Sequence, residues 1–275
     1  EIMPSLVGSE MCIRDSDVPG LTGQVANVIV QRASLTGQYE WQIEWRPDTQ
    51  RFYPGDANVS VSGASGHFDY TLALASSGYR GGVIGPIFVE DGLGTLLEMQ
   101  DYSNLESRDA QRVSANLGWD AGPQTRLNLN GSYQQAYNQT DGIENADGGT
   151  LPARLRNLLN TNDQTEYELS GDIAFPLVGG RLKLIGLRRE NTFDYLDEVT
   201  DQYLVLDPTG GRYASLGGSQ ETIGRAEYGW AMLGGDWQLA AEAAFNSFDR
   251  LASLFTLTPD AVSYTHLRAH ETRHD

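Results

Sequence analysis

The strongest constraint on the fold is a two-residue alternation of apolar and polar side chains that recurs along the chain. In residues 38–46 one face carries four large apolar side chains, Tyr39, Trp41, Ile43 and Trp45. The other face carries Gln38, Glu40, Gln42 and Glu44. Such a strand lies between an apolar and an aqueous environment. Similar alternation appears in 59–63, 67–75, 111–119, 125–137, 165–175, 181–190, 221–232 and 237–245.

The connections between these segments differ in length. Tight turns are expected at residues 63–66, 120–123, 176–180 and 234–235. Longer polar stretches, expected to be loops, lie at 78–107, 138–163 and 194–219. Short turns at one end and long loops at the other are typical of outer-membrane barrels. The sequence therefore predicts an all-β fold: an incomplete antiparallel up-and-down transmembrane β-barrel of about nine strands over residues 35–261.

Residues 151–160 break the alternation. Leucines recur there at helical spacing, at Leu151, Leu155, Leu158 and Leu159. Pro152 is acceptable in a first helical turn because its missing N–H has no partner there. This stretch therefore predicts a short amphipathic helix inside a long loop.

The tryptophans also point to a membrane. All five fall in expected strands, and four of the five lie near a strand end. The five are Trp41, Trp45, Trp119, Trp230 and Trp237. Tryptophan is enriched at the membrane–water interface, so we expect membrane-interface girdles. Tryptophans in the core of a β-sandwich are the alternative explanation.

Composition restricts the function. The net charge of −18 argues against nucleic acid as a partner, because phosphates need a basic surface. The chain has no run of about 18 apolar residues, so no transmembrane helix is expected. The acidic residues Asp141, Glu144 and Asp147 do not have calcium-loop spacing. Because no catalytic or phosphate-binding motif occurs either, we expect no enzyme, no cofactor and no metal site.

The two ends of the chain differ from the rest. Residues 1–16 and 262–275 resemble translated sequencing-adapter sequence, and we expect both to be foreign segments. The single cysteine, Cys12, lies in the first of them. Three histidines lie in the second at helical spacing, His266, His270 and His274, and without further ligands they predict no metal site.

Residues 20–31 (GLTGQVANVIVQ) combine a glycine turn with a β-branched run. The residues that carry the pattern are Gly23, Val25, Asn27, Val28 and Ile29. This segment resembles the end of the plug domain of TonB-dependent outer-membrane receptors, in which the first barrel strand follows closely, as 38–46 does here. Ala26, Val30 and Gln31 depart from the commoner pattern. The resemblance implies that residues 17–34 are the C-terminal end of a plug domain.

The resemblance also implies a function: energised uptake of a scarce ligand across the cell outer membrane. Its expected partners are outer-membrane lipid, a small-molecule ligand (iron-siderophore, cobalamin or oligosaccharide) and the TonB energy-coupling protein, through an N-terminal segment outside this chain. Aromatic and basic residues of the long stretches are the expected ligand contacts: Tyr79, Arg80, Tyr102, Tyr137, Arg212 and Tyr213. A passive porin-like barrel, or a secreted β-sandwich that acts as an adhesin or carbohydrate-binding module, are the alternatives.

Overall fold

The computed structural model describes residues 12–15, 24–27, 35–257 and 262–274, and all secondary-structure elements in these ranges are strands. β1 (Cys12–Asp15) and β2 (Gln24–Asn27) pair with each other. The other strands form one sheet: β3 (Leu35–Arg46), β4 (Arg51–Ser65), β5 (Phe68–Glu90), β6 (Leu96–Gly122), β7 (Thr125–Gly149), β8 (Arg154–Leu177), β9 (Gly180–Tyr203), β10 (Thr209–Met232), β11 (Gly235–Leu257) and β12 (Val262–His274).

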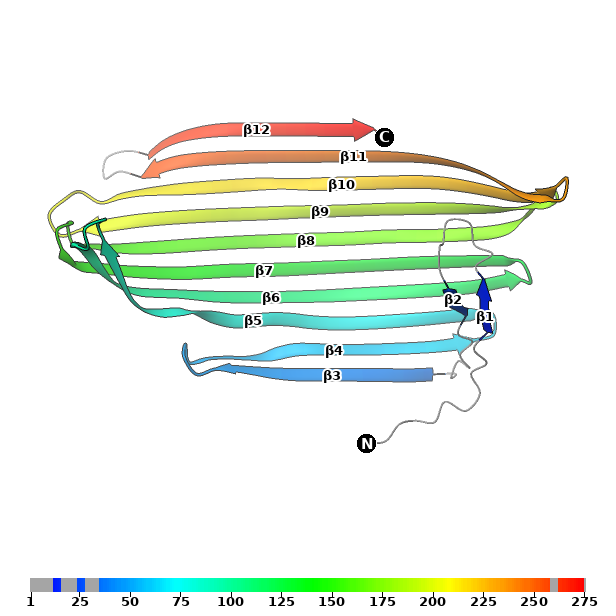
Figure 1. Ribbon diagram of the computed structural model, residues 1–275, viewed down its shortest axis with the longest axis horizontal. Helices are drawn as coiled ribbons and strands as arrows, with labels where there is room; N and C mark the ends of the chain where they lie inside the picture. Colours follow the sequence, from blue (N-terminus) through cyan, green and yellow to red (C-terminus); the bar gives the residue numbers. More distant parts are fainter. Residues whose placement is uncertain (1–11, 16–23, 28–34, 258–261, 275) are drawn as a thin grey trace.

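The large sheet is an antiparallel meander. Each strand pairs with its neighbours in sequence, in the order β3 to β12, without a crossover (Figure 1). The sheet does not close, because β3 does not pair with β12. The nine strands β3–β11 confirm the predicted all-β, up-and-down arrangement of an incomplete barrel. β12 pairs with β11 in the segment expected to be foreign, and the foreign origin stays a prediction.

The predicted plug-end motif is described only in part. Val25 and Asn27 lie in β2 and pair with Arg14 and Cys12. Gly23, Val28 and Ile29 lie outside the described residues. The assignment of 17–34 to a plug domain therefore stays a prediction.

The two ends of the sheet have different connections. At one end, here called the turn end, two residues join successive strands, at 66–67, 123–124, 178–179 and 233–234. At the opposite end, the loop end, four or five residues join them, at 47–50, 91–95, 150–153 and 204–208. The predicted tight turns are confirmed.

The predicted long loops are wrong. Most of 78–107, 138–163 and 194–219 is strand, and each of these stretches contains two strand ends and one short connection. On β6 and β7 both faces of these strand ends carry polar residues: Ser107 lies opposite Gln139, and Glu106 opposite Thr140. Where both faces are polar, the two-residue alternation disappears although the backbone pairing continues.

The predicted helix at 151–160 is also wrong. Residues 150–153 connect two strands, and residues from Arg154 onward belong to β8. Leu158 lies opposite Gly142 of β7 and Val199 of β9. Pairing with a strand on each side outweighs the helical spacing of the leucines, since local propensity is weak against tertiary context.

The sheet has an apolar and a polar face near its turn end. Cross-strand partners share a face, so one row contains Leu72, Ala115, Gly131 and Leu169. The adjacent row, on the opposite face, contains Thr71, Asn116, Asn130 and Ser170. The apolar belt is formed by alternate residues of 68–74, 113–119, 127–133, 167–175, 182–184, 226–230 and 237–245.

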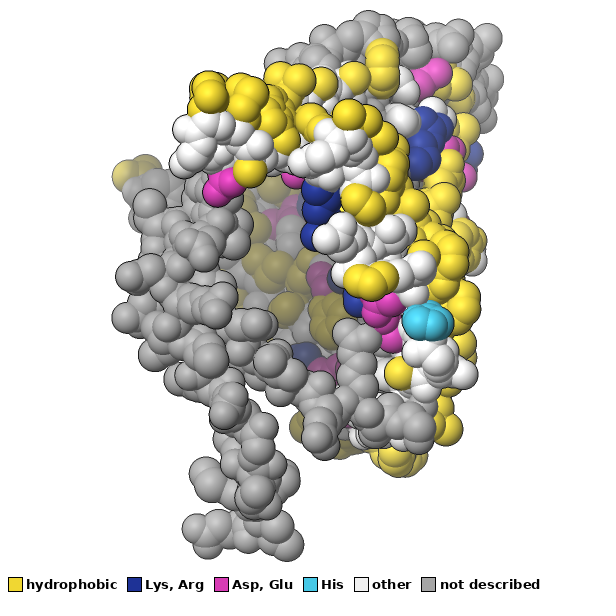
Figure 2. Space-filling model, turned by 90° about the vertical axis from the view of Figure 1, so that its right-hand side faces the viewer, with side chains coloured by type: hydrophobic (Ala, Val, Ile, Leu, Met, Phe, Trp, Pro, Cys, Tyr) yellow, Lys and Arg dark blue, Asp and Glu magenta, His cyan; other side chains and the backbone are white. Residues whose placement is uncertain are grey.

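The belt covers the convex side of the wall. Figure 2 looks along the strands from the turn end and shows hydrophobic side chains gathered along the outer edge, with charged side chains inside the hollow. We therefore call the belt side the outer face and the other side the inner face. Five of the seven belt stretches contain seven to nine residues, which span about 20–30 Å along the strand. This length is close to the height of about 25 Å of a lipid-facing band.

The sheet has no packed core of the sandwich type. Among the described residues, the buried apolar ones are Tyr53, Ala110, Ala136, Ala146 and Ala174. By contrast, Trp41 is 54% exposed and Leu129 is 40% exposed. A β-sandwich would bury such residues between two sheets, and the described strands do not have that arrangement.

Candidate functional site

Aromatic side chains gather at the turn end of the belt. The ring of Phe68 on β5 stacks on that of Trp119 on β6, with centroids 6.0 Å apart. Tyr228 and Trp230 on β10 stack at 5.3 Å, and Trp230 lies opposite Trp237 on β11. Three of the predicted interface tryptophans therefore lie at the same end of the belt.

These aromatic residues also bond to the backbone of the turns. The hydroxyl of Tyr228 donates to the carbonyl oxygens of Leu177 and Val178, each at 3.0 Å. The indole N–H of Trp237 donates to the carbonyl oxygen of Met232 at 3.1 Å. An apolar ring with a polar tip suits an interface between lipid and water.

The other two tryptophans lie on β3, farther toward the loop end. Trp41 lies opposite Ala57, and its indole N–H donates to the carbonyl oxygen of Pro54 at 2.6 Å. Trp45 lies opposite Phe52. They do not join the turn-end cluster.

A second aromatic pair marks the other edge of the belt, and sequence reasoning did not single it out. Tyr133 on β7 lies opposite Tyr167 on β8, and both are exposed. Their position in the alternation was visible in the sequence. That the two tyrosines lie side by side at the edge of the belt follows only from the register between β7 and β8, which the sequence does not supply.

The inner face near the turn end is held by ion pairs. The guanidinium of Arg126 lies 3.2 Å from a carboxylate oxygen of Asp69 and 3.0 Å from one of Asp120. The side-chain amide of Asn128 donates to Asp172 at 3.1 Å. These groups face the hollow, which suits a water-filled interior.

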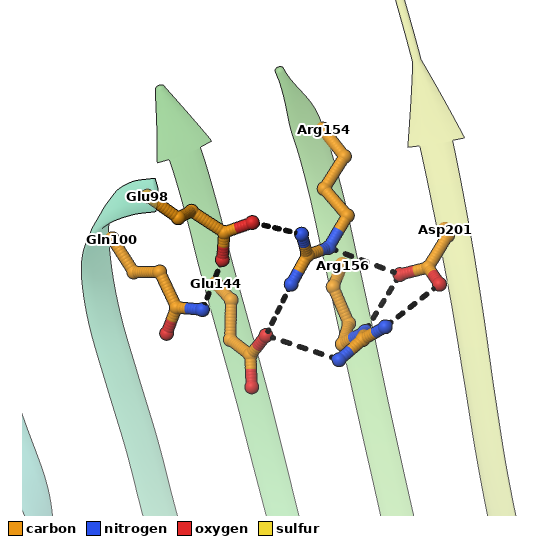
Figure 3. A network of polar contacts seen from close by, with 6 residues as sticks. All are labelled: Glu98, Gln100, Glu144, Arg154, Arg156 and Asp201. Carbon is orange, nitrogen blue, oxygen red and sulfur yellow. Dashed lines mark hydrogen bonds and ion pairs between the residues drawn. The ribbon is translucent and has the colours of Figure 1, made fainter. Parts of the chain in front are cut away.

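A denser network lies on the inner face at the loop end (Figure 3). Arg154 of β8 pairs with Glu98 of β6, which also accepts a hydrogen bond from Gln100. Arg156 donates to both carboxylate oxygens of Asp201 on β9, at 2.6 and 2.9 Å. The side chains of Glu98 and Arg154 are 5% and 12% exposed. Glu144 of β7, 3.7 Å from Arg154 and 3.5 Å from Arg156, completes a contact across four strands.

The network favours the charged form of its acids. Burial alone would raise the pKa of Glu98, but hydrogen bonds from Gln100 and Arg154 outweigh it, so the pKa is lowered. The hydrogen bond from Arg156 lowers the pKa of Asp201 against an opposing effect of burial. The same bond raises the pKa of Arg156. These groups are therefore charged at neutral pH, and their ion pairs link the loop ends of β6–β9. This set of ion pairs is called the clamp below.

The six predicted ligand contacts do not form one site. Their cross-strand partners place Arg80, Tyr137 and Arg212 on the outer face and Tyr79, Tyr102 and Tyr213 on the inner face. All three residues on the outer face donate to neighbouring side chains, and Arg212 donates to Glu198. Arg80 bonds both carboxylate oxygens of Asp109 at 2.8 Å, and the hydroxyl of Tyr137 donates to Gln139 at 2.9 Å.

The three inner-face residues lie apart along the hollow. Tyr79 donates its hydroxyl to Glu106. Tyr102 lies opposite Glu144, in the row of the loop-end network. Tyr213 accepts a hydrogen bond from Arg250 at 2.7 Å.

Tyr213 belongs to an aromatic–arginine cluster that sequence reasoning missed. Tyr195 meets Tyr213 edge to face at 6.0 Å, and the guanidinium of Arg250 lies 5.8 Å from the ring centroid of Phe193. Arg250 also donates to the hydroxyl of Ser215 at 2.8 Å. Half-buried rings and a cation that face a hollow are groups that bind small polar molecules. The residues come from three strands, so no short sequence motif contains them.

Within the described ranges, no set of His, Cys, Asp and Glu side chains is grouped to hold a metal ion. The same residues contain no helix of the length and hydrophobicity that would cross a membrane. Comparisons with protein-family models, curated proteins and solved structures found no match to this chain.

Proposed function

We propose that the chain is part of a TonB-dependent receptor of the outer membrane, with β3–β11 as barrel wall, and that the receptor takes up a scarce ligand by energised transport. The observation that carries the membrane part is the one-sided apolar belt with an aromatic cluster at its turn end. An exposed apolar surface of this size needs an apolar partner. Lipid fits because the opposite face of β5–β8 carries mostly polar residues in the same rows.

The energised part of the proposal rests on residues 20–31. Their resemblance to a plug end supports a receptor over a passive porin. The aromatic–arginine cluster around Tyr213, together with Tyr102, supplies inner-face groups suited to contact a small ligand in the hollow. An iron-siderophore, a cobalamin or an oligosaccharide would each use such groups.

The membrane part can be tested by fluorescence quenching. The full chain is folded in micelles of a detergent with brominated alkyl chains, and tryptophan emission is compared with that in the unbrominated detergent. We expect strong quenching, because Trp119, Trp230 and Trp237 would contact the alkyl chains. A chain that is monodisperse without detergent and is quenched only by aqueous iodide would contradict the proposal.

The receptor part makes a separate prediction about the source DNA. Sequence upstream of residue 17 is expected to encode a plug domain of about a hundred residues, and sequence downstream of residue 261 further alternating strands. A parent protein without a plug would instead be a passive porin-like barrel.

A further inference from the structure

A groove of about 670 Å³ crosses the outer face of the belt on β7–β10. Its walls are apolar side chains, among them Leu129, Leu169, Ile173 and Leu184. The groove lies in the middle of the belt, so under the proposed function it opens toward lipid chains.

The floor of the groove is backbone. Gly171 lies opposite Gly186, which lies opposite Gly224. A Cβ at Gly186 or Gly224 would meet nothing within 4 Å, so the packing of the described residues does not require glycine there. Glycine inside a strand costs about 0.5–1 kcal/mol relative to alanine. At regularly paired positions, such glycines often mark the close approach of a ligand.

A cation lies at the end of the groove nearer the loop end. Arg188 is on the same face as Gly186, two residues farther along β9, and its side chain is 40% exposed. Its guanidinium donates to Thr222 at 2.7 Å and to Gln220 at 2.8 Å, which fixes its position. An arginine on a lipid-facing surface is unfavourable by up to about 2–4 kcal/mol. A phosphate would offset this cost by charge-assisted hydrogen bonds.

An anion follows the cation. Glu190 is the next outer-face residue of β9, and a carboxylate oxygen lies 3.4 Å from the guanidinium of Arg188. The same oxygen accepts a hydrogen bond from Tyr167 at 2.8 Å. Along the outer face of β9, toward the loop end, the apolar groove is followed by the cation of Arg188 and then by the anion of Glu190. Successive residues of one face are about 6–7 Å apart. An ethanolamine phospholipid has the complementary order of acyl chain, phosphate and ammonium.

From this match we infer that the groove binds one molecule of a phosphoethanolamine lipid, with an acyl chain over Gly186, the phosphate on Arg188 and the ammonium on Glu190. The inference rests on the proposed function, since it needs the belt to face lipid. A purely anionic lipid would meet Glu190 unfavourably. A choline lipid has no N–H to donate to that carboxylate.

Lipid retention tests the inference. The full chain is folded in detergent micelles, exposed to phosphatidylethanolamine, phosphatidylcholine or phosphatidylglycerol with identical acyl chains, and examined by native mass spectrometry. We expect one ethanolamine lipid to be retained about tenfold more than either of the others, which corresponds to about 1.4 kcal/mol.

Matched variants locate the site. Gly186→Leu fills the groove, and Arg188→Gln removes the phosphate contact, so each should lower retention about tenfold. Gly37→Leu, on the outer face of β3, and Arg189→Gln, on the inner face beside Arg188, should leave it unchanged.

The outcomes separate the two proposals. Equal retention of the three lipids, or equal retention by Gly186→Leu and Gly37→Leu, would overturn the groove and leave the membrane proposal standing. A chain that folds as a monodisperse monomer without detergent would overturn the membrane proposal and the groove with it.

Discussion

Arg154 is the residue on which the loop-end network depends, because it lies within 4 Å of three carboxylates from three strands. Replacing it with methionine would leave Glu98 buried without its cation. Breaking a buried ion pair costs about 3–5 kcal/mol. For Arg154→Met we therefore expect amide protection at the ends of β6–β9 to fall at least about 100-fold, measured by hydrogen exchange with mass spectrometry.

Arg212 provides the matched control. It pairs with Glu198 on the outer face, and its side chain is 47% exposed. Exposed ion pairs contribute about 0–1 kcal/mol. Arg212→Met should therefore change protection about fivefold at most, and an equal loss in the two variants would show that burial of the network does not matter.

The lowered pKa values of Glu98 and Asp201 predict a pH dependence. An acid whose folded pKa is below its unfolded value stabilises fully above the unfolded value, about 4, and the stabilisation is lost as the pH falls through the folded value. Protection factors at the loop end should therefore be equal at pH 7 and pH 5 and lower at pH 3. Glu98→Gln should flatten this profile, whereas an unchanged profile would remove Glu98 from the clamp.

Residue type alone predicts which side chains could contact a ligand, but not which face of the sheet they occupy. Tyr102 and Tyr213 were selected as aromatic groups in polar stretches, and both face the hollow. Arg80 and Arg212 were selected on the same basis and face outward in ion pairs. The difference is one of register, because a shift of one residue moves a side chain to the opposite face.

At the scale of the element, the turn between β8 and β9 contains local strain. Val178 has a φ of 41° and Gly179 a φ of 77°, a pair of positive values typical of a type I′ turn. An L-residue with a Cβ pays roughly 1–2 kcal/mol in the left-handed region, and asparagine tolerates it better. Val178 is 90% exposed, so its replacement loses little packing. Val178→Asn should therefore stabilise the chain by about 1 kcal/mol in urea unfolding in micelles.

Val83→Asn is the control for this prediction. Val83 is 63% exposed inside β5, where the backbone is extended. Asparagine disfavours strands, so this variant should gain nothing or lose a few tenths of a kcal/mol. If both variants gained the same unfolding free energy, the stabilisation would come from a more polar surface and not from the geometry of the turn.

Strand positions near the turn end were predictable, and strand lengths were not. Alternation identified β5–β11 where one face is apolar. Toward the loop end β6 and β7 carry polar residues on both faces, so the two-residue alternation ends there. Strands of 23–27 residues are therefore predicted as short strands separated by loops. Pairing with neighbouring strands supplies the missing information there, as it does for the leucines of 155–159.

At the scale of the whole molecule, the belt predicts that the effect of a charge depends on depth. Leu129 lies midway across the belt on β7, Val113 lies at its edge on β6, and Asn130 lies on the inner face. Arginine on a lipid-facing strand costs about 2–4 kcal/mol at the membrane midplane and about 0–1 kcal/mol near the interface. In lipid vesicles the loss of unfolding free energy should therefore be largest for Leu129→Arg, small for Val113→Arg and near zero for Asn130→Arg.

This ranking distinguishes lipid from protein as the partner of the belt. A protein partner would bury Leu129 and Val113 alike. The arginine penalty would then not differ between the two positions in a way that depends on bilayer thickness. Repeating the measurement in vesicles with shorter acyl chains sharpens the test, because a thinner bilayer moves Leu129 closer to both interfaces. The Leu129→Arg penalty should then fall toward that of Val113→Arg, and a penalty independent of chain length would mean that the belt does not face lipid.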